Sequence, residues 1–195
     1  MTGSPPDLLV LHAVRLLGFA EPDAVAARAG VPETEAAELI LDAQVRGWVQ
    51  HSTFGGLGGW YLTDAGKAEN ERQLATERRA ADPDDVIPLL YQDFLPLNTR
   101  LVTACTDWQL RPTRQARVLN ELGILGSALE PLVDRLAGVL TRFDGYHTRY
   151  AAALTRARAG GHEWVDRTDR DSCHKVWFQL HEDLIATLGI TRQTG

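Results

Sequence analysis

The chain has 195 residues, of which 44% are hydrophobic and 24% are charged, a composition typical of a globular protein and unlike that of a disordered or fibrous one. Acidic residues outnumber basic ones by 26 to 20, so the formal net charge of -6 gives no overall attraction to nucleic acid or to an anionic membrane. No stretch approaches the length of an apolar membrane span, and the N-terminus lacks the basic start of a signal peptide. We therefore expect a cytoplasmic protein without membrane contact.

Three helices are predicted at the start of the chain. Apolar residues at helical spacing predict a first helix over 8–17 that stops at Gly18. A second short helix begins near residue 21 and ends at Gly30, and a third follows Pro32 and runs to Gly47.

A β-hairpin is predicted after the third helix. Residues 48–54 have the pattern of a strand, residues 60–62 that of a returning strand, and the glycine-rich residues 55–59 that of the loop between them. Thr63 is a suitable N-cap for the mostly polar helix expected over 64–81.

This order of elements is that of a winged helix-turn-helix, in which the third helix enters the major groove of DNA. Residues 8–77 resemble the winged-helix domains of MarR-like and PadR-like bacterial regulators. Three segments carry the resemblance: Ala29-Gly30-Val31-Pro32, Arg46-Gly47-Trp48-Val49, and Tyr61-Leu62-Thr63-Asp64-Ala65-Gly66-Lys67, which is similar to the Y-x-L-T-x-x-G-[KR] motif that closes the wing in those families.

The resemblance implies binding to double-stranded DNA as a homodimer. The DNA contacts expected on this interpretation come from the second and third helices, the hairpin and the start of the fourth helix: Arg28, Thr34, Glu38, Arg46, His51, Thr53, Gly56, Gly58 and Lys67.

The charge of the third helix departs from that pattern. Its outward positions are Glu33, Thr34, Glu35, Ala37, Glu38, Leu41 and Asp42. Four of these seven are acidic, and an acid that faces a phosphate weakens DNA binding. No Lys or Arg lies between His51 and Tyr61 in the hairpin. Two interpretations stay open: either the surrounding basic residues hold DNA, or the domain is a protein-interaction adaptor whose acidic face and exposed Leu41 meet a basic partner.

A second domain, all-helical, is expected over 82–195, after a first domain over 1–81. Asp82 is a suitable cap and Pro83 a suitable first residue for a long helix that contains Pro96. Its broad apolar stripe consists of Leu89, Leu90, Phe94, Leu97, Leu101, Val102, Cys105 and Trp108.

Further on, apolar residues at alternating spacings of four and three form a helical-bundle seam from Val118 to Phe143, which is also a candidate dimer interface. Gly123, Gly126 and Pro131 predict an interruption, and Ser127 with Glu130 has the pattern of a capping box, so we expect two helices here. The last helix is predicted over 167–188.

The second domain offers few chemical groups. Cys105 and Cys173 have neither disulfide nor zinc spacing and are expected in the core; His174 and His181 are expected to pack and not to bind a metal. A small-molecule pocket is a weaker alternative to a packed core for the aromatic group Tyr91, Phe94, Trp108, Trp177 and His181. No catalytic motif is present, so we expect neither an enzyme nor a cofactor.

Taken together, these features predict a mainly α protein in which an N-terminal winged helix-turn-helix with a two-stranded wing precedes an all-α helical bundle. The first hypothesis is a one-component transcriptional regulator that binds operator DNA as a homodimer and senses a small-molecule effector through its helical domain. The alternative hypothesis is a winged-helix adaptor that binds a protein and no DNA.

Overall fold

The computed structural model describes residues 3–190. The chain is mainly helical, with a two-stranded antiparallel sheet after the third helix, as the sequence predicts. Contacts divide it into two compact units: an N-terminal unit, residues 3–81 together with 185–190, and a C-terminal unit, residues 82–184. Within the described residues, no helix has the length and apolarity needed to cross a membrane.

The two units do not coincide with the expected domains, which are separated by one boundary after residue 81. The chain end from Ile185 groups with the N-terminal unit, although residues 82–195 are expected to form one domain. The physical reason is a small buried cluster in which Ala186 packs with Leu8 and Leu74.

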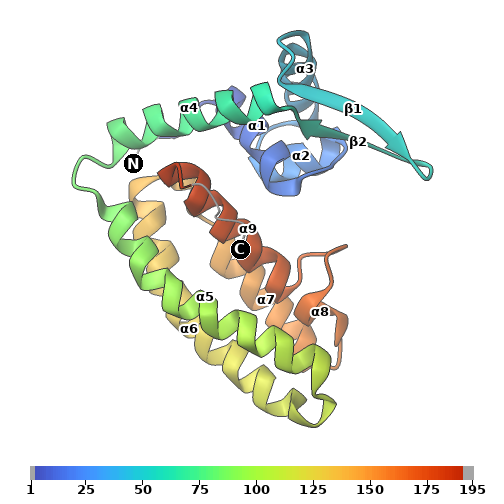
Figure 1. Cartoon of the computed structure of the whole chain (residues 1–195), viewed down its shortest axis with the longest axis vertical. Coiled ribbons are helices and arrows are strands. Elements are labelled where there is room, and N and C mark those ends of the chain that lie inside the picture. The colour runs from blue at the N-terminus through green and yellow to red at the C-terminus, as the bar shows by residue number, and fades with distance from the viewer. Residues whose placement is uncertain (1–2, 191–195) are drawn as a thin grey trace. The chain divides into compact units, whose positions relative to one another are not determined.

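The N-terminal unit begins with the three predicted helices, which end before Gly18, Gly30 and Gly47 (Figure 1). Thr63 caps the fourth helix as predicted, because its hydroxyl oxygen accepts a hydrogen bond from the Gly66 amide at 3.0 Å. The elements are α1 (Pro6–Leu17), α2 (Pro22–Ala29), α3 (Glu33–Val45), β1 (Val49–Phe54), β2 (Leu57–Leu62) and α4 (Asp64–Ala81).

The hairpin loop is shorter than the predicted one over 55–59. Strand β2 starts at Leu57, so only Gly55 and Gly56 form the turn, both with positive φ, as a tight two-residue hairpin requires. Gly58 and Gly59 lie inside β2. A Cβ at Gly59 would lie 2.6 Å from the Phe19 ring, whereas one at Gly58 would come within 2.5 Å of only the movable carboxylate end of Glu21.

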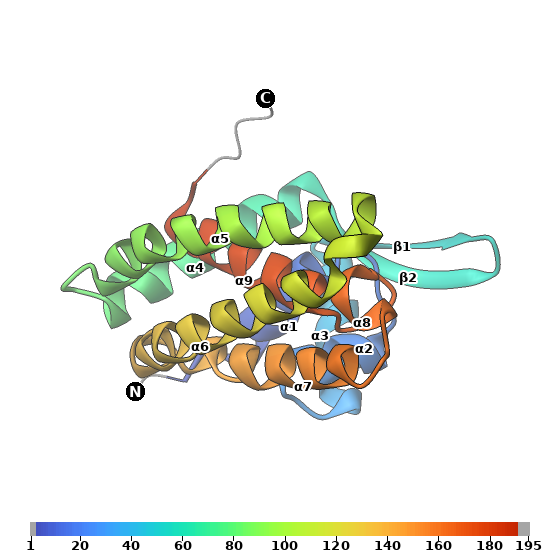
Figure 2. The ribbon, with the colours of Figure 1, turned by 90° about the horizontal axis from the view of Figure 1, so that it is seen from below.

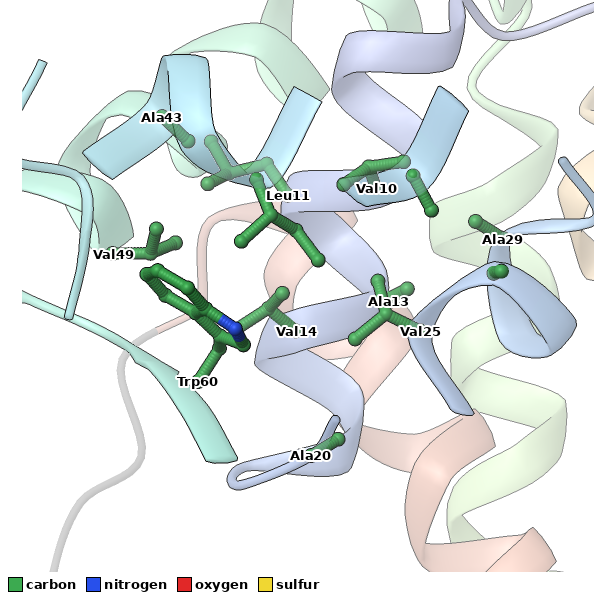
Figure 3. Close-up of a cluster of buried hydrophobic side chains, with 13 residues drawn as sticks. Val10, Leu11, Ala13, Val14, Ala20, Val25, Ala29, Ala43, Val49 and Trp60 are labelled. Atoms are coloured by element: carbon green, nitrogen blue, oxygen red, sulfur yellow. The ribbon is translucent and has the colours of Figure 1, made fainter. Parts of the chain in front are cut away.

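The hairpin is fixed to the helices at its base. Trp60 and Ala20 exchange two backbone hydrogen bonds, of 2.8 and 3.1 Å, which tie β2 to the segment between α1 and α2. Figure 3 shows the Trp60 ring directed into the core, beside Val49 and Val14. The hairpin therefore leaves the helical core in one defined direction.

The C-terminal unit is a bundle in which the long helices lie side by side (Figures 1 and 2). Its elements are α5 (Val86–Leu110), a 3-10 turn (Pro112–Arg114), α6 (Gln115–Val139), a 3-10 turn (Thr141–Phe143), α7 (Tyr146–Arg158), α8 (Glu163–Asp166) and α9 (Cys173–Leu188), of which the last turn belongs to the N-terminal unit.

Two helix starts differ from the predictions. Helix α5 begins at Val86 and not near Pro83, although Asp82 does cap it: its carboxylate accepts the backbone amides of Val86 at 2.7 Å and Ile87 at 3.0 Å. Helix α9 begins at Cys173 and not near residue 167, because Ser172 accepts the Lys175 amide at 3.1 Å and so starts the helix there.

The predicted interruption between residues 123 and 131 is wrong, since α6 is one continuous helix. Gly126 makes room for α7, because a Cβ there would lie 3.1 Å from the buried Tyr150 ring. Ser127 does not act as a cap, because its hydroxyl donates to the Gly123 carbonyl one turn earlier at 3.3 Å.

The seam from Val118 to Phe143 is buried by the bundle itself, except for the half-buried Val139. It is therefore unavailable as the dimer interface considered above. Of the stripe predicted on α5, Leu89 and Val102 are exposed, with 61% and 52% of their surfaces accessible. They lie beyond the edges of the buried arc, because one side of a helix buries a narrower band than the predicted stripe.

Candidate functional site

The outward face of α3 combines acidic and apolar side chains. The opposite face is inserted into the core through Ala36, Ile40 and Ala43. Thr34 and Glu38, two of the residues expected to contact DNA, are exposed and lie one helical turn apart. Leu41 and Val45 follow on the next two turns of the same face, where 53% and 88% of their surfaces are accessible.

The positions of two of the four acidic residues on α3 are explained by the stability of the helix itself. Glu33 and Glu35 lie in the first turn, where the partial positive charge of the helix N-terminus favours carboxylates. Glu38 and Asp42 are further along the helix and exposed, so they contribute a negative charge to the face without that role.

Basic residues lie at the ends of α3 and not on its face. Arg46 follows the last turn, exposed, with its guanidinium 4.8 Å from the centre of the Trp48 ring. Lys67 is exposed in the first turn of α4. The start of α4 is held near Trp48, and so near Arg46, because the Thr63 amide donates a hydrogen bond to the Trp48 carbonyl at 3.0 Å. Arg28, half-buried at the end of α2, lies at the other end of α3.

The hairpin residues expected to contact DNA form a separate group, since they extend away from the helices with β1 and β2 (Figure 1). His51 and Thr53 are exposed on β1, and the His51 ring lies edge-on to Trp60 with centroids 5.1 Å apart. Gly56 is in the turn, and Gly58 is opposite Thr53 in the strand register. Neither strand carries a Lys or Arg residue.

Four of the five residues of the expected ligand pocket come together between α5 and α9. Phe94 stacks with Trp177 at 5.2 Å and lies 5.3 Å from the His181 ring, while the Tyr91 hydroxyl is 3.4 Å from His181 Nε2. Trp108 is not in this group; it lies further along α5 and packs edge-on to His162. Trp177 is 1% exposed and Phe94 is fully buried, so the group forms part of the packed core.

Both cysteines are buried, as predicted. Burial raises the pKa of each thiol to about 12, so neither is a thiolate near neutral pH. Within residues 3–190, no three His, Cys, Asp or Glu side chains are grouped as a metal site would require.

The sequence analysis missed a buried polar network in the C-terminal unit. Arg142 and Asp183 form an ion pair whose side chains are 3% and 1% exposed, and the Tyr146 hydroxyl donates to the same carboxylate at 2.9 Å. At the edge of this network, the partly exposed Arg149 makes two hydrogen bonds, of 2.8 and 2.9 Å, to the exposed carboxylate of Asp171. The partners are 22 to 41 residues apart in the sequence, so no local pattern indicates them.

Val45 was also missed on the outward face of α3. The helical spacing of four residues after Leu41 is a signal for it, and its high exposure makes the end of α3 more apolar than the acid count indicates.

The chain was compared with models of known protein families, with curated proteins and with solved structures, and none of the three comparisons found a match.

Proposed function

We propose that the N-terminal unit is a winged helix-turn-helix of the kind found in MarR-like and PadR-like regulators. We propose further that the protein is a transcriptional regulator that binds double-stranded DNA as a homodimer. The observation that carries this proposal is the arrangement of three helices and a hairpin in which α3 buries one face and exposes the other, while β2 is anchored to the α1–α2 segment through Ala20 and Trp60.

In this proposal, DNA is held by basic residues at the end of α3 and by residues on its outward face. Arg46 and Lys67 are exposed at one end of α3 and are assigned to phosphates, whereas Thr34 and Glu38 face outward and are assigned to bases. A glutamate is compatible with that role, because its carboxylate accepts a hydrogen bond from the amino group of cytosine.

The test is fluorescence anisotropy with a mixture of short duplexes at about 50 and about 200 mM salt. We expect binding that weakens with salt. Arg46→Ala and Lys67→Ala should each weaken it and lower the slope of log K against log salt by about 0.9, the value for one lost phosphate contact. The matched control is Arg79→Ala, an exposed residue near the other end of α4. No binding at the lower salt would refute the proposal, and equal effects of all three variants would refute the assignment of Arg46 and Lys67.

A second candidate function is a protein-binding adaptor, and the observation that favours it is the α3 face. Leu41 and Val45 are exposed one turn apart and are accompanied by Glu38 and Asp42. Such a face is complementary to an amphipathic segment that carries both cationic and apolar side chains.

The adaptor is tested with a labelled synthetic helical peptide that has Lys and Leu at helical spacing. We expect binding that Glu38→Lys and Val45→Ser weaken. Glu130→Lys on α6 makes the same change of net charge at an exposed position of the other unit, so it serves as the control for nonspecific attraction. Equal losses in Glu38→Lys and Glu130→Lys would mean that net charge alone attracts the peptide, which would remove the adaptor hypothesis.

A further inference from the structure

Helix α5 has an outward face without any charged residue. Only three of its 25 residues are charged, Asp93, Arg100 and Asp107, and they recur at intervals of seven along one flank. All three form ion pairs within the described chain: Asp93 with Arg135, Arg100 with Glu121, and Asp107 with Arg111 and Arg114. A solvated helix face normally carries charges, so this one is unusual for a surface in water.

The outward face runs the length of the helix at spacings of three and four residues. Leu89 near one end, Val102 and Leu110 at the other end expose 61%, 52% and 72% of their surfaces. The face consists of Pro88, Leu89, Gln92, Leu95, Pro96, Thr99, Val102, Thr103, Thr106 and Leu110.

The threonines make the centre of this face less polar than their side chains suggest. The hydroxyls of Thr99, Thr103 and Thr106 each donate to the carbonyl of the residue four positions earlier, at 3.2, 3.0 and 2.9 Å. Because these three hydroxyls already have acceptors within α5, contact with another apolar surface leaves none of the three without a partner. Small side chains at the centre also permit the close approach of a second helix.

We propose that this face of α5 is the homodimer interface, with the same face of a second copy as its occupant. The face is self-complementary about Thr99: in an antiparallel pair centred there, Leu89 of each copy meets Leu110 of the other, and the small threonines meet at the crossing. A two-fold pair of this kind places identical surfaces together, as closed dimers require. The absence of charge makes a charged partner, such as nucleic acid or a basic peptide, a poor occupant.

The area suits a weak dimer. The stripe is about 33 Å long and about 10 Å wide, so two copies bury roughly 700 Å² in total, which is the size of a weak, transient interface and below that of a standard one. We therefore expect dissociation in the micromolar range. The inference gives a surface to the homodimer of the proposed function, but it is tested without DNA, so a failure of DNA binding leaves it standing.

The experiment is sedimentation velocity of the full chain from about 1 to about 100 µM. The wild type should change from monomer to dimer over this range, and Thr103→Glu should raise the dimer dissociation constant at least ~100-fold, because each copy would bring an unpaired charge into the contact. Thr155→Glu on α7 is the matched control, since Thr155 is also exposed and also donates to a carbonyl of its own helix, at 2.8 Å. A wild type that stays monomeric, or equal effects of the two variants, would overturn the proposal.

A crosslinking experiment decides the matter if Thr103→Glu fails to fold. Thr99→Cys should form a disulfide-linked dimer under air oxidation, whereas Thr155→Cys should not. The native Cys105 and Cys173 do not compete, because both are buried. Failure of Thr99→Cys to link, or equal linking of both variants, would also overturn the proposal.

Discussion

Replacement of Gly66 by alanine should destabilise the N-terminal unit, although the same change in a helix ordinarily stabilises a protein. Gly66 lies in the first turn of α4, directly against the start of β1. A Cβ there would overlap the Trp48 carbonyl oxygen and lie 2.7 Å from the carbonyl carbon. Both are backbone atoms, so a change of side-chain rotamer cannot relieve the overlap.

The size of the effect follows from the contacts that must separate. Moving α4 away from β1 weakens two hydrogen bonds from Thr63 to the Trp48 carbonyl, one from its amide at 3.0 Å and one from its hydroxyl at 3.2 Å. Two hydrogen bonds contribute about 1 kcal/mol each, and the overlap costs about 1–3 kcal/mol more. The helix preference of alanine offsets about 1 kcal/mol. We therefore expect a net loss of about 2–4 kcal/mol in the free energy of unfolding.

The assay is urea denaturation followed by circular dichroism and tryptophan fluorescence. Gly138→Ala on α6 is the control, because a Cβ at Gly138 meets nothing within 4 Å and should stabilise the protein by about 0.5–1 kcal/mol. The reasoning is refuted if Gly66→Ala is as stable as the wild type, or if both variants change stability in the same direction.

Three further predictions concern the C-terminal unit. Asp183→Ala should cost about 3–5 kcal/mol in urea denaturation, because it leaves Arg142 buried without this carboxylate, whereas Asp169→Ala on the surface should cost much less; equal costs would contradict the assigned burial. Cys105 and Cys173 should resist iodoacetamide at pH 8 until the protein unfolds, and rapid labelling of the native protein would contradict their burial. Because burial raises both thiol pKa values from 9.0 to about 12, the folded state keeps protons that the unfolded state loses, so stability measured by thermal melting should fall between about pH 9 and 12; a constant melting temperature over that range would contradict the shift.

The sequence predicted the elements whose signals are local. Helix ends at Gly18 and Gly30, the Thr63 cap and the mainly helical fold with one hairpin are all confirmed, because each depends on residues within a few positions of one another. The wrong predictions have a common cause. Gly126 is one of the residues that predict a helix break, but it makes room for the buried Tyr150 ring, 24 positions later on α7.

The candidate sites show the same limit. The exposure of Thr34 and Glu38 could be predicted, because the period of α3 determines which residues face outward. The separation of Trp108 could be predicted as well, because it lies 14 residues, about 21 Å, after Phe94 on one helix, whereas the pairing of Phe94 with Trp177 depends on how α5 and α9 pack. The ion pair of Arg142 with Asp183 likewise joins residues far apart in the chain, and charge alone does not identify which acid an arginine will meet.

The grouping of Ala186 with Leu8 and Leu74 has a consequence for how the chain is made. During synthesis the ribosome releases residues 3–81 first, but the apolar surface of Leu8 and Leu74 receives its last neighbour only when the final helix emerges. The first unit to leave the ribosome is thus the last to be completed. A fragment ending at residue 81 should therefore keep an exposed apolar patch of the kind that chaperones recognise. In the full chain, folding begins in the N-terminal unit and is completed there when the last helix is added.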